Sequence, residues 1–281
     1  MSYYRIYHYP FGTQYKHVYF KGGRPTGPAE AAEREDREEA DRLEESLCRS
    51  RRLLRDYVLC NKWDLFCTFT FDMAKVNRYD YKECSAVLRK FFNNYRNRYS
   101  SNFRYIVIPE FHKDGAIHFH GFVRGIRPDD LYVPEMIQKR VGGQLVDIPN
   151  TRQYVRWKNY SYGNFDCSAI RSIEAAAHYA VKYITKDLMA LPKGLKVVLH
   201  SANLQKPELI LDMDDLPCFK DKPDFVGDYC VFKFTDELYG ILPDYWNESC
   251  SEVRRPDAEL DGYPFEAFTG EQLKIRVGPF R

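Results

Sequence analysis

Apolar and polar residues alternate most clearly in residues 104–123, RYIVIPEFHKDGAIHFHGFV. Two β-branched and aromatic runs flank a polar segment that ends in Asp114 and Gly115, and this pattern predicts a β-hairpin. Successive side chains of a strand point to opposite faces of the sheet. Ile117 and Phe119 on the second run are therefore predicted to serve the core.

The opposite face of the same hairpin carries candidate chemistry. His118 and His120 stand two residues apart, so both side chains leave one face of the sheet. Glu110 closes the first run and is expected beside them across the hairpin. Two imidazoles and one carboxylate can hold a divalent cation and leave positions open for a substrate. The alternative is a half-buried strand with two hydrogen-bonded histidines and no metal.

A helix is predicted over residues 175–187, AAAHYAVKYITKD, which open on alanines and contain no Gly or Pro. Tyr179, Lys182, Tyr183 and Lys186 recur at i, i+3, i+4 and i+7 and share one helix face. A phenol with a pKa of roughly 10 is a poor nucleophile near neutral pH, but nearby cations favour the phenolate. The alternative is a solvated helix face that carries long amphipathic side chains.

The remaining patterns complete an α+β architecture. Strands are predicted at residues 4–9, 17–20, 63–71, 154–160, 165–171, 196–199, 208–213 and 229–234, and helices at 28–59, 81–99 and, within a long excursion, 134–140. We expect a central antiparallel sheet of about five strands with helices on one face. The predicted domains are an N-terminal extension with a charged helix (1–60), a central domain (61–190) and a C-terminal extension packed on the core (191–281).

Composition narrows the function classes only slightly. The chain of 281 residues has a net charge of +2, so any surface for nucleic acid must be local, and its 16% aromatic content suits a core and base-stacking surfaces. Eight scattered cysteines without a Cys-x-x-Cys pair argue against a zinc finger and fit a reducing cytoplasm. We find no secretion signal, no membrane-spanning run and no phosphate-binding loop of an ATP-driven helicase.

Three motifs in this order resemble the HUH endonucleases, in particular the rolling-circle replication initiators of small single-stranded DNA phages and related plasmids. Residues 66–72, FCTFTFD, resemble the family's FxTLTF strand. His118-Phe119-His120 resembles its His-hydrophobic-His motif, and the segment from Tyr179 to Lys186 is similar to its paired-tyrosine motif. The resemblance covers residues 61–187.

The resemblance implies a palm-like nuclease fold and a metal-dependent, site-specific nicking and joining of single-stranded DNA. Glu110, His118 and His120 would hold Mg²⁺ or Mn²⁺, with no other cofactor. Tyr179 and Tyr183 would be the nucleophiles, with a weak preference for Tyr179 as the first. The family precedent implies a 5′-phosphotyrosine and a free 3′-OH that primes synthesis.

The same resemblance implies roles for the lysines and for partners. Lys182 and Lys186 would neutralise phosphate charge or lower the pKa of the tyrosines. Expected partners are single-stranded or hairpin origin DNA, a host helicase and a host polymerase, in the cytoplasm of a bacterial host and without a membrane.

Two rival functions remain open at this point. One is a related strand transferase, either a plasmid relaxase or a single-strand transposase. The transposases usually use one tyrosine, and the relaxases usually carry three histidines and an N-terminal tyrosine. The other rival is a DNA-binding protein whose catalytic motifs have decayed.

Overall fold

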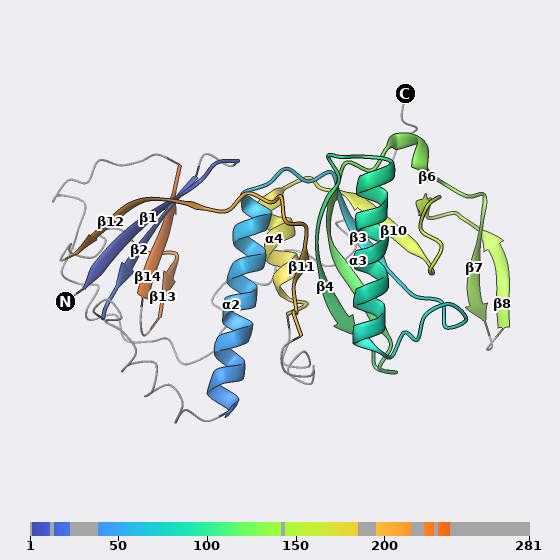
Figure 1. The fold of residues 1–281 in the computed structure, drawn as a ribbon, viewed down its shortest axis with the longest axis horizontal. Coiled ribbons are helices and arrows are strands. Elements are labelled where there is room, and N and C mark those ends of the chain that lie inside the picture. The colour runs from blue at the N-terminus through green and yellow to red at the C-terminus, as the bar shows by residue number, and fades with distance from the viewer. Residues whose placement is uncertain are drawn as a thin grey trace. The chain divides into compact units, whose positions relative to one another are not determined.

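The computed structural model describes residues 2–11, 14–22, 39–141, 144–184, 195–214, 222–227 and 230–236. The chain divides into two compact units (Figure 1). Unit 1 consists of Met1–Arg42, Leu59–Asn61 and Gln205–Thr269. Unit 2 consists of Leu43–Val58, Lys62–Leu204 and Gly270–Arg281.

Unit 1 is built on an antiparallel sheet in the order β12-β1-β2-β14-β13. Its strands are β1 (Tyr3–Tyr9), β2 (Gln14–Phe20), β12 (Glu208–Asp214), β13 (Phe225–Val226) and β14 (Cys230–Thr235). The strands predicted at 4–9, 17–20, 208–213 and 229–234 are confirmed. The two early strands pair with strands roughly two hundred residues later in the chain, around buried Tyr4, Ile6 and Val231.

Unit 2 is built on a second five-stranded antiparallel sheet, in the order β10-β3-β5-β4-β11. Its strands are β3 (Leu65–Phe69), β4 (Arg104–Phe111), β5 (Ile117–Arg124), β10 (Phe165–Ala169) and β11 (Leu199–His200). The helices are α2 (Glu39–Leu59), α3 (Tyr81–Arg98) and α4 (Ile173–Val181), with a 3₁₀ turn at Pro128–Asp130. The predicted α+β class with a five-stranded antiparallel sheet is confirmed.

Helix α3 covers one face of this sheet. Asp80 caps its first turn by accepting hydrogen bonds from the backbone N–H groups of Lys82 and Glu83. The buried stripe of α3 packs on the face formed by odd-numbered strand residues such as Phe69, which meets Phe92 edge to face at 5.2 Å. This face is the apolar core of unit 2.

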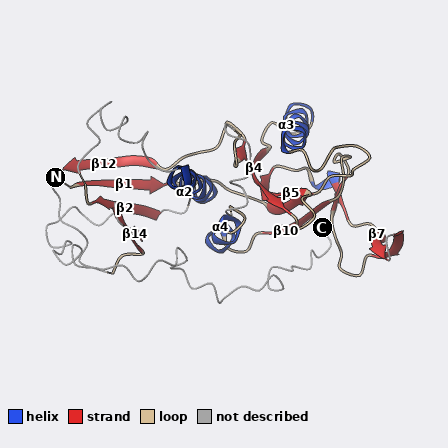
Figure 2. Ribbon diagram, turned by 90° about the horizontal axis from the view of Figure 1, so that it is seen from below, coloured by secondary structure: helices blue, strands red, loops and turns tan. Residues whose placement is uncertain are grey.

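Helix α4 lies on the opposite side of β4, β5 and β10 from α3 (Figure 2). The face below α4 carries the even-numbered strand residues, including His118 and His120. Two layers of helix therefore enclose the sheet, where we had expected helices on one face. The sequence of α4 explains the second layer, because Ala176, Ala177 and Ala180 are buried and allow close approach.

Residues 134–140 were predicted to be helical, and this prediction is wrong. The structure has two strands there, β7 (Met136–Val141) and β8 (Gln144–Pro149), which pair with each other. A second short ladder joins β6 (Leu131–Tyr132) to β9 (Arg156–Trp157). Residues 136–140, MIQKR, favour a helix by propensity alone. The Gly-Gly pair between two runs with β-branched residues is the hairpin signal that was missed.

Other sequence-based expectations concern domains and membranes. The predicted domain limits at residues 60 and 190, and the packing of 191–281 on the core, stay predictions. Among the helices in the described ranges, none is both long and apolar enough to cross a bilayer.

Gly121, in the middle of β5, allows β4 and β5 to lie close together. It stands opposite both Val107 of β4 and Cys67 of β3. A Cβ atom at this position would collide with the backbone oxygen of Ile106 and would lie 2.6 Å from Val107 Cα. Both obstacles are backbone atoms and cannot rotate away.

We therefore predict that Gly121→Ala lowers the free energy of unfolding by about 1–3 kcal/mol or more, the usual cost of overpacking. Gly22→Ala is the control, because nothing lies within 4 Å of a Cβ atom there. Urea denaturation of both variants measures the difference. Equal stability of Gly121→Ala and the natural protein would contradict this account of the β4–β5 contact.

Candidate active site

The β4–β5 hairpin brings Glu110, His118 and His120 together as the sequence predicted. Glu110 stands directly opposite His118 in the ladder. Its carboxylate reaches the diagonal neighbour instead, and Glu110 Oε2 lies 2.5 Å from His120 Nε2. His120 is buried, with 8% of its surface exposed, and His118 is half-buried.

The second nitrogen of His120 is held by the neighbouring strand. Thr68 stands opposite His120 across β3 and β5, and its Oγ1 lies 3.0 Å from His120 Nδ1. A hydroxyl can donate or accept, so Thr68 suits either tautomer of the ring. When Thr68 accepts from Nδ1–H, Nε2 carries a lone pair, which is the state that a metal ligand needs.

His118 is stacked on His112 of the hairpin turn, with ring centroids 3.7 Å apart. Burial, followed by the nearby His112 and His120, lowers the pKa of His118 to about 4. His118 is therefore neutral near pH 7, and a neutral imidazole is the form that binds metal ions.

Glu110 remains ionised in this setting. The hydrogen bond from His120 lowers the pKa of the Glu110 carboxyl below its ordinary value, against the opposing effect of burial. His112 Nε2 also lies 4.0 Å from Glu110 Oε2. The group thus combines one anionic oxygen ligand with neutral imidazole nitrogens.

This donor set fits a divalent cation in kind, because imidazole and carboxylate suit manganese, and carboxylate suits magnesium. The support of His120 by Thr68 also resembles the outer hydrogen bonds of metal-bound histidines. Within the described ranges, however, no group of three or more His, Cys, Asp or Glu side chains is spaced to enclose an ion. Glu110 and His120 bond to each other, so a cation would have to replace that hydrogen bond.

The tyrosine helix begins as the sequence predicted but ends earlier. Ser172 caps α4 by accepting a hydrogen bond from the Ala175 N–H at 3.2 Å. The helix ends at Val181 and continues in a tighter turn, in which Tyr183 N donates to Ala180 O and Ile184 N to Val181 O. Lys186 lies outside the described residues.

Tyr179 and Tyr183 meet at their hydroxyl groups. The Tyr183 hydroxyl donates to the Tyr179 oxygen at 2.8 Å, and the two rings lie edge to face. Burial, then the hydrogen bond to Tyr179 and the nearby Glu110 carboxylate, raises the pKa of Tyr183 far above that of a free phenol. The Lys182 ammonium lies 3.5 Å from the centre of the Tyr179 ring and 5.4 Å from that of Tyr183.

The two motifs meet through one aromatic contact. The Tyr183 ring stacks on the His120 imidazole, with centroids 4.3 Å apart and planes 9° from parallel. Phe66 of β3 completes the contact, since its ring meets Tyr179 edge to face at 5.5 Å. Residues from β3, β4, β5 and α4 therefore form one site.

Arg51 of α2 binds the end of the tyrosine segment. Its Nε and Nη2 both donate to the Ile184 carbonyl oxygen, at 3.0 and 2.8 Å. A cation beside the last carbonyls of a helical segment also complements the helix dipole. The sequence had suggested a solvated or DNA-binding role for the arginines near residues 49–55, and this one has a structural role.

Sequence reasoning missed four residues at the site. Phe66 and Thr68 were placed on the correct face of their strand but without partners, and His112 was regarded only as part of a turn. Arg51 is 133 positions from the carbonyl that it binds. The one available signal was the position of His112 two residues after Glu110, at the hairpin turn.

We predict that Arg51→Ala lowers the free energy of unfolding by about 1–3 kcal/mol, the usual range for hydrogen bonds to a charged group. It should also speed hydrogen exchange of the amides at residues 180–184. Arg52→Ala, an exposed neighbour on α2, is the matched control. If the two variants exchange and unfold alike, Arg51 does not hold this segment.

Comparisons with known proteins agree with one part of this interpretation. No curated protein and no solved structure matches the chain. Residues 64–188 match the model of a family of replication-associated proteins, of the ORF2 and gene 2 protein type. The matched segment includes β3, β4, β5 and α4 with the described histidine and tyrosine residues, so over this segment the chain is similar to replication-associated proteins, and a role in replication is supported.

Proposed function

We propose that the protein is a rolling-circle replication initiator that nicks and rejoins single-stranded DNA at a specific site through a 5′-phosphotyrosine intermediate. One observation carries the proposal: the ring of Tyr183 stacks on the imidazole of His120. Paired phenol groups thereby lie against two imidazoles and a carboxylate. The replication-associated family that matches residues 64–188 supports the biological setting.

Glu110, His118 and His120 are the residues that would hold Mg²⁺ or Mn²⁺. When bound, the ion would supply Lewis-acid polarisation of the scissile phosphate and offset the charge that develops on it. Thr68 keeps the His120 ring in position by its contact with Nδ1. The low pKa of His118 keeps that ring neutral and able to bind metal.

The tyrosines would perform the transfer itself. A phenol oxygen attacks phosphorus, the bond from phosphorus to the 3′ oxygen breaks, and the DNA remains attached through its 5′ phosphate. The phenol loses its proton and the departing 3′ oxygen gains one, so charge is balanced. The phosphodiester is stored in the covalent link and can be rejoined when a 3′-OH attacks it.

Contacts at the site favour Tyr179 as the first nucleophile. Its oxygen accepts the hydrogen bond from Tyr183, and a donated hydrogen bond stabilises a phenolate. Lys182 is also nearer to the Tyr179 ring than to that of Tyr183. The raised pKa of Tyr183 disfavours its own ionisation before DNA is bound. Tyr183 would make the second cut, after one round of synthesis.

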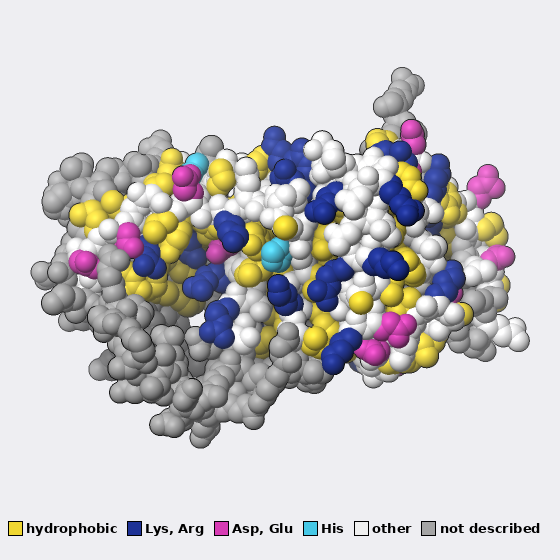
Figure 3. Space-filling model, in the orientation of Figure 1, with side chains coloured by type: hydrophobic (Ala, Val, Ile, Leu, Met, Phe, Trp, Pro, Cys, Tyr) yellow, Lys and Arg dark blue, Asp and Glu magenta, His cyan; other side chains and the backbone are white. Residues whose placement is uncertain are grey.

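Single-stranded or hairpin origin DNA is the proposed partner, with a host helicase and polymerase acting after the nick in a bacterial cytoplasm. Lys182 would neutralise phosphate charge at the site, and Lys186 is proposed to share this role. Lys and Arg side chains are also spread over the side of unit 2 that bears α2 and α3 (Figure 3). Arg52, Arg89, Lys90 and Arg98 are exposed there.

The test of this function is a covalent adduct. Labelled hairpin oligonucleotides from the DNA that flanks the gene are incubated with the protein and Mn²⁺, and the products are separated under denaturing conditions. A covalent protein–DNA band is expected. A shifted but uncleaved oligonucleotide under native conditions, with no covalent band, would identify a DNA-binding protein without catalysis.

For the tyrosines, we predict that Tyr179→Phe and Tyr183→Phe each keep some single-turnover nicking and each lose the second cut that releases a closed circle. Tyr179→Phe should slow the first cut more, because the favoured phenolate is removed. Only the double variant should lose the adduct completely. Tyr99→Phe, exposed on the C-terminal side of α3, is the control. An adduct that survives in the double variant would refute the assignment.

For the metal ligands, we predict that His118→Ala and His120→Ala each reduce nicking by at least about a hundredfold, because even loss of an outer partner of a metal ligand costs tenfold to a hundredfold. Mn²⁺ should raise the melting temperature of the natural protein and not that of the double alanine variant. His8→Ala on β1 is the control. Nicking by the double variant at the natural rate would exclude these ligands.

A further inference from the structure

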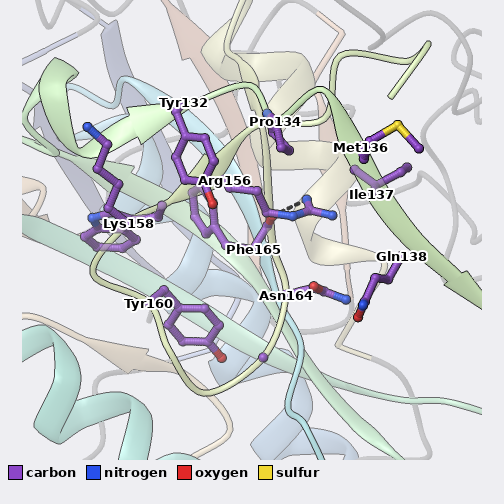
Figure 4. Close-up of a pocket in the computed structure, with 12 residues that line it drawn as sticks. Tyr132, Pro134, Met136, Ile137, Gln138, Arg156, Lys158, Tyr160, Asn164 and Phe165 are labelled. Atoms are coloured by element: carbon purple, nitrogen blue, oxygen red, sulfur yellow. Dashed lines mark hydrogen bonds between the residues drawn. The ribbon is translucent and has the colours of Figure 1, made fainter. Parts of the chain in front are cut away.

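A pocket of about 300 Å³ lies beside β10, apart from the histidine and tyrosine residues (Figure 4). It is lined by parts of β6, β7, β9 and the turn that leads into β10. Its volume is at the lower end of the range for small-molecule sites, which suits a ligand of the size of one nucleotide. None of the residues proposed for catalysis lines it.

The pocket has a positive lining. Arg156 and Lys158 belong to it, and no carboxylate is among its described lining residues. Arg156 donates to the carbonyl oxygens of Val155 and Phe165, and Lys158 donates to that of Asp129. Both cations are thus oriented by neutral partners and keep their full charge, so an anionic group is the ligand that complements them.

Two amide side chains face the same space without partners. Asn164 and Gln138 line the pocket, and in the described part of the chain neither side-chain amide makes a hydrogen bond. The backbone of Asn164 is fixed, because its N–H donates to Thr70 Oγ1 and its carbonyl accepts from Thr70 N, both at 2.9 Å. Figure 4 shows both amides and the Arg156 guanidinium around one opening. Unpaired amides held in this way suit the edge of a base.

An aromatic ring stands at the same opening. Tyr132 lines the pocket, is 45% exposed, and pairs with Arg156 across β6 and β9. Met136, 49% exposed, adds a flexible apolar side chain. An exposed ring beside a cation is the usual platform for an unstacked base of single-stranded nucleic acid.

The pocket is close to the proposed cleavage site along one strand. Phe165, at the start of β10, lines it, and Ser168 on the same strand pairs with Phe66, which contacts Tyr179. Three residues of a strand span about 10 Å. A DNA strand with its scissile phosphate at Tyr179 could therefore place a nearby nucleotide in the pocket.

We propose that this pocket binds one unstacked base of single-stranded DNA near the nick, and so helps to select the cleavage site; this rests on the proposed function. Tyr132 stacks on the base, Arg156 and Lys158 contact its phosphates, and Asn164 and Gln138 read its edge. An amide pairs best with the N6 and N7 positions of adenine, so adenine is the expected base.

The test uses the full chain with Tyr179→Phe and Tyr183→Phe, so that DNA is bound but not cut. Fluorescence anisotropy measures the affinity for short labelled oligonucleotides of each single base. We expect binding to oligo-dA about tenfold tighter than to oligo-dT. Adding Asn164→Ala and Gln138→Ala should bring this ratio close to one. Both amides lack protein partners within the described residues, so their loss should not disturb folding.

Asn94→Ala removes an exposed amide from α3 and is the matched control, with an unchanged ratio expected. The proposal is overturned if the pocket variants keep the natural base preference, or if the parent chain has none. This result is separable from the function itself. A covalent adduct without an effect of the pocket variants would sink only the pocket, and a pocket-dependent base preference without an adduct would sink only the nuclease.

Discussion

The antiparallel pairing of β4 with β5 places Glu110 opposite His118 and Ile108 opposite His120. A slip of one residue would turn both histidines into the apolar core and bring Phe119 out to α4. The hydrophobic alternation of both strands prevents such a slip, since Ile117 and Phe119 are fully buried under α3. Gly121 lets the two backbones come together at the same level. The chemistry on one face of the sheet thus depends on packing on the other.

In the described structure, the polar groups at the site are paired with each other. Glu110 bonds to His120, Tyr183 bonds to Tyr179, and His112 stacks on His118. Enclosure between sheet and helix removes water, which lowers the pKa of His118 and raises that of Tyr183. Electrostatic effects are also stronger in such a setting. Binding of a cation and a phosphate would exchange these internal pairs for contacts with the ligands.

The parts of the site that the sequence could predict are those with a local period. The His-x-His spacing and the Tyr-x-x-x-Tyr spacing each fix a face of one element, and the structure has both pairs on common faces. Arg51 could not be predicted, because its partner Ile184 is remote in sequence and the contact is to a backbone carbonyl. The β7–β8 hairpin was missed because helix propensity outweighed the Gly-Gly signal. Where α4 ends also depends on tertiary contacts rather than on its alanine-rich composition.

The central claim is that a phenol of the tyrosine segment becomes linked to DNA beside His120. Peptide mapping by mass spectrometry of the protein after reaction with single-stranded origin DNA and Mn²⁺ tests it most directly. The account predicts a nucleotide attached to Tyr179, with Tyr183 as the second site of attachment in reactions that proceed beyond one cut. Attachment to a residue outside this segment, or cleaved DNA with no nucleotide on the protein, would contradict it.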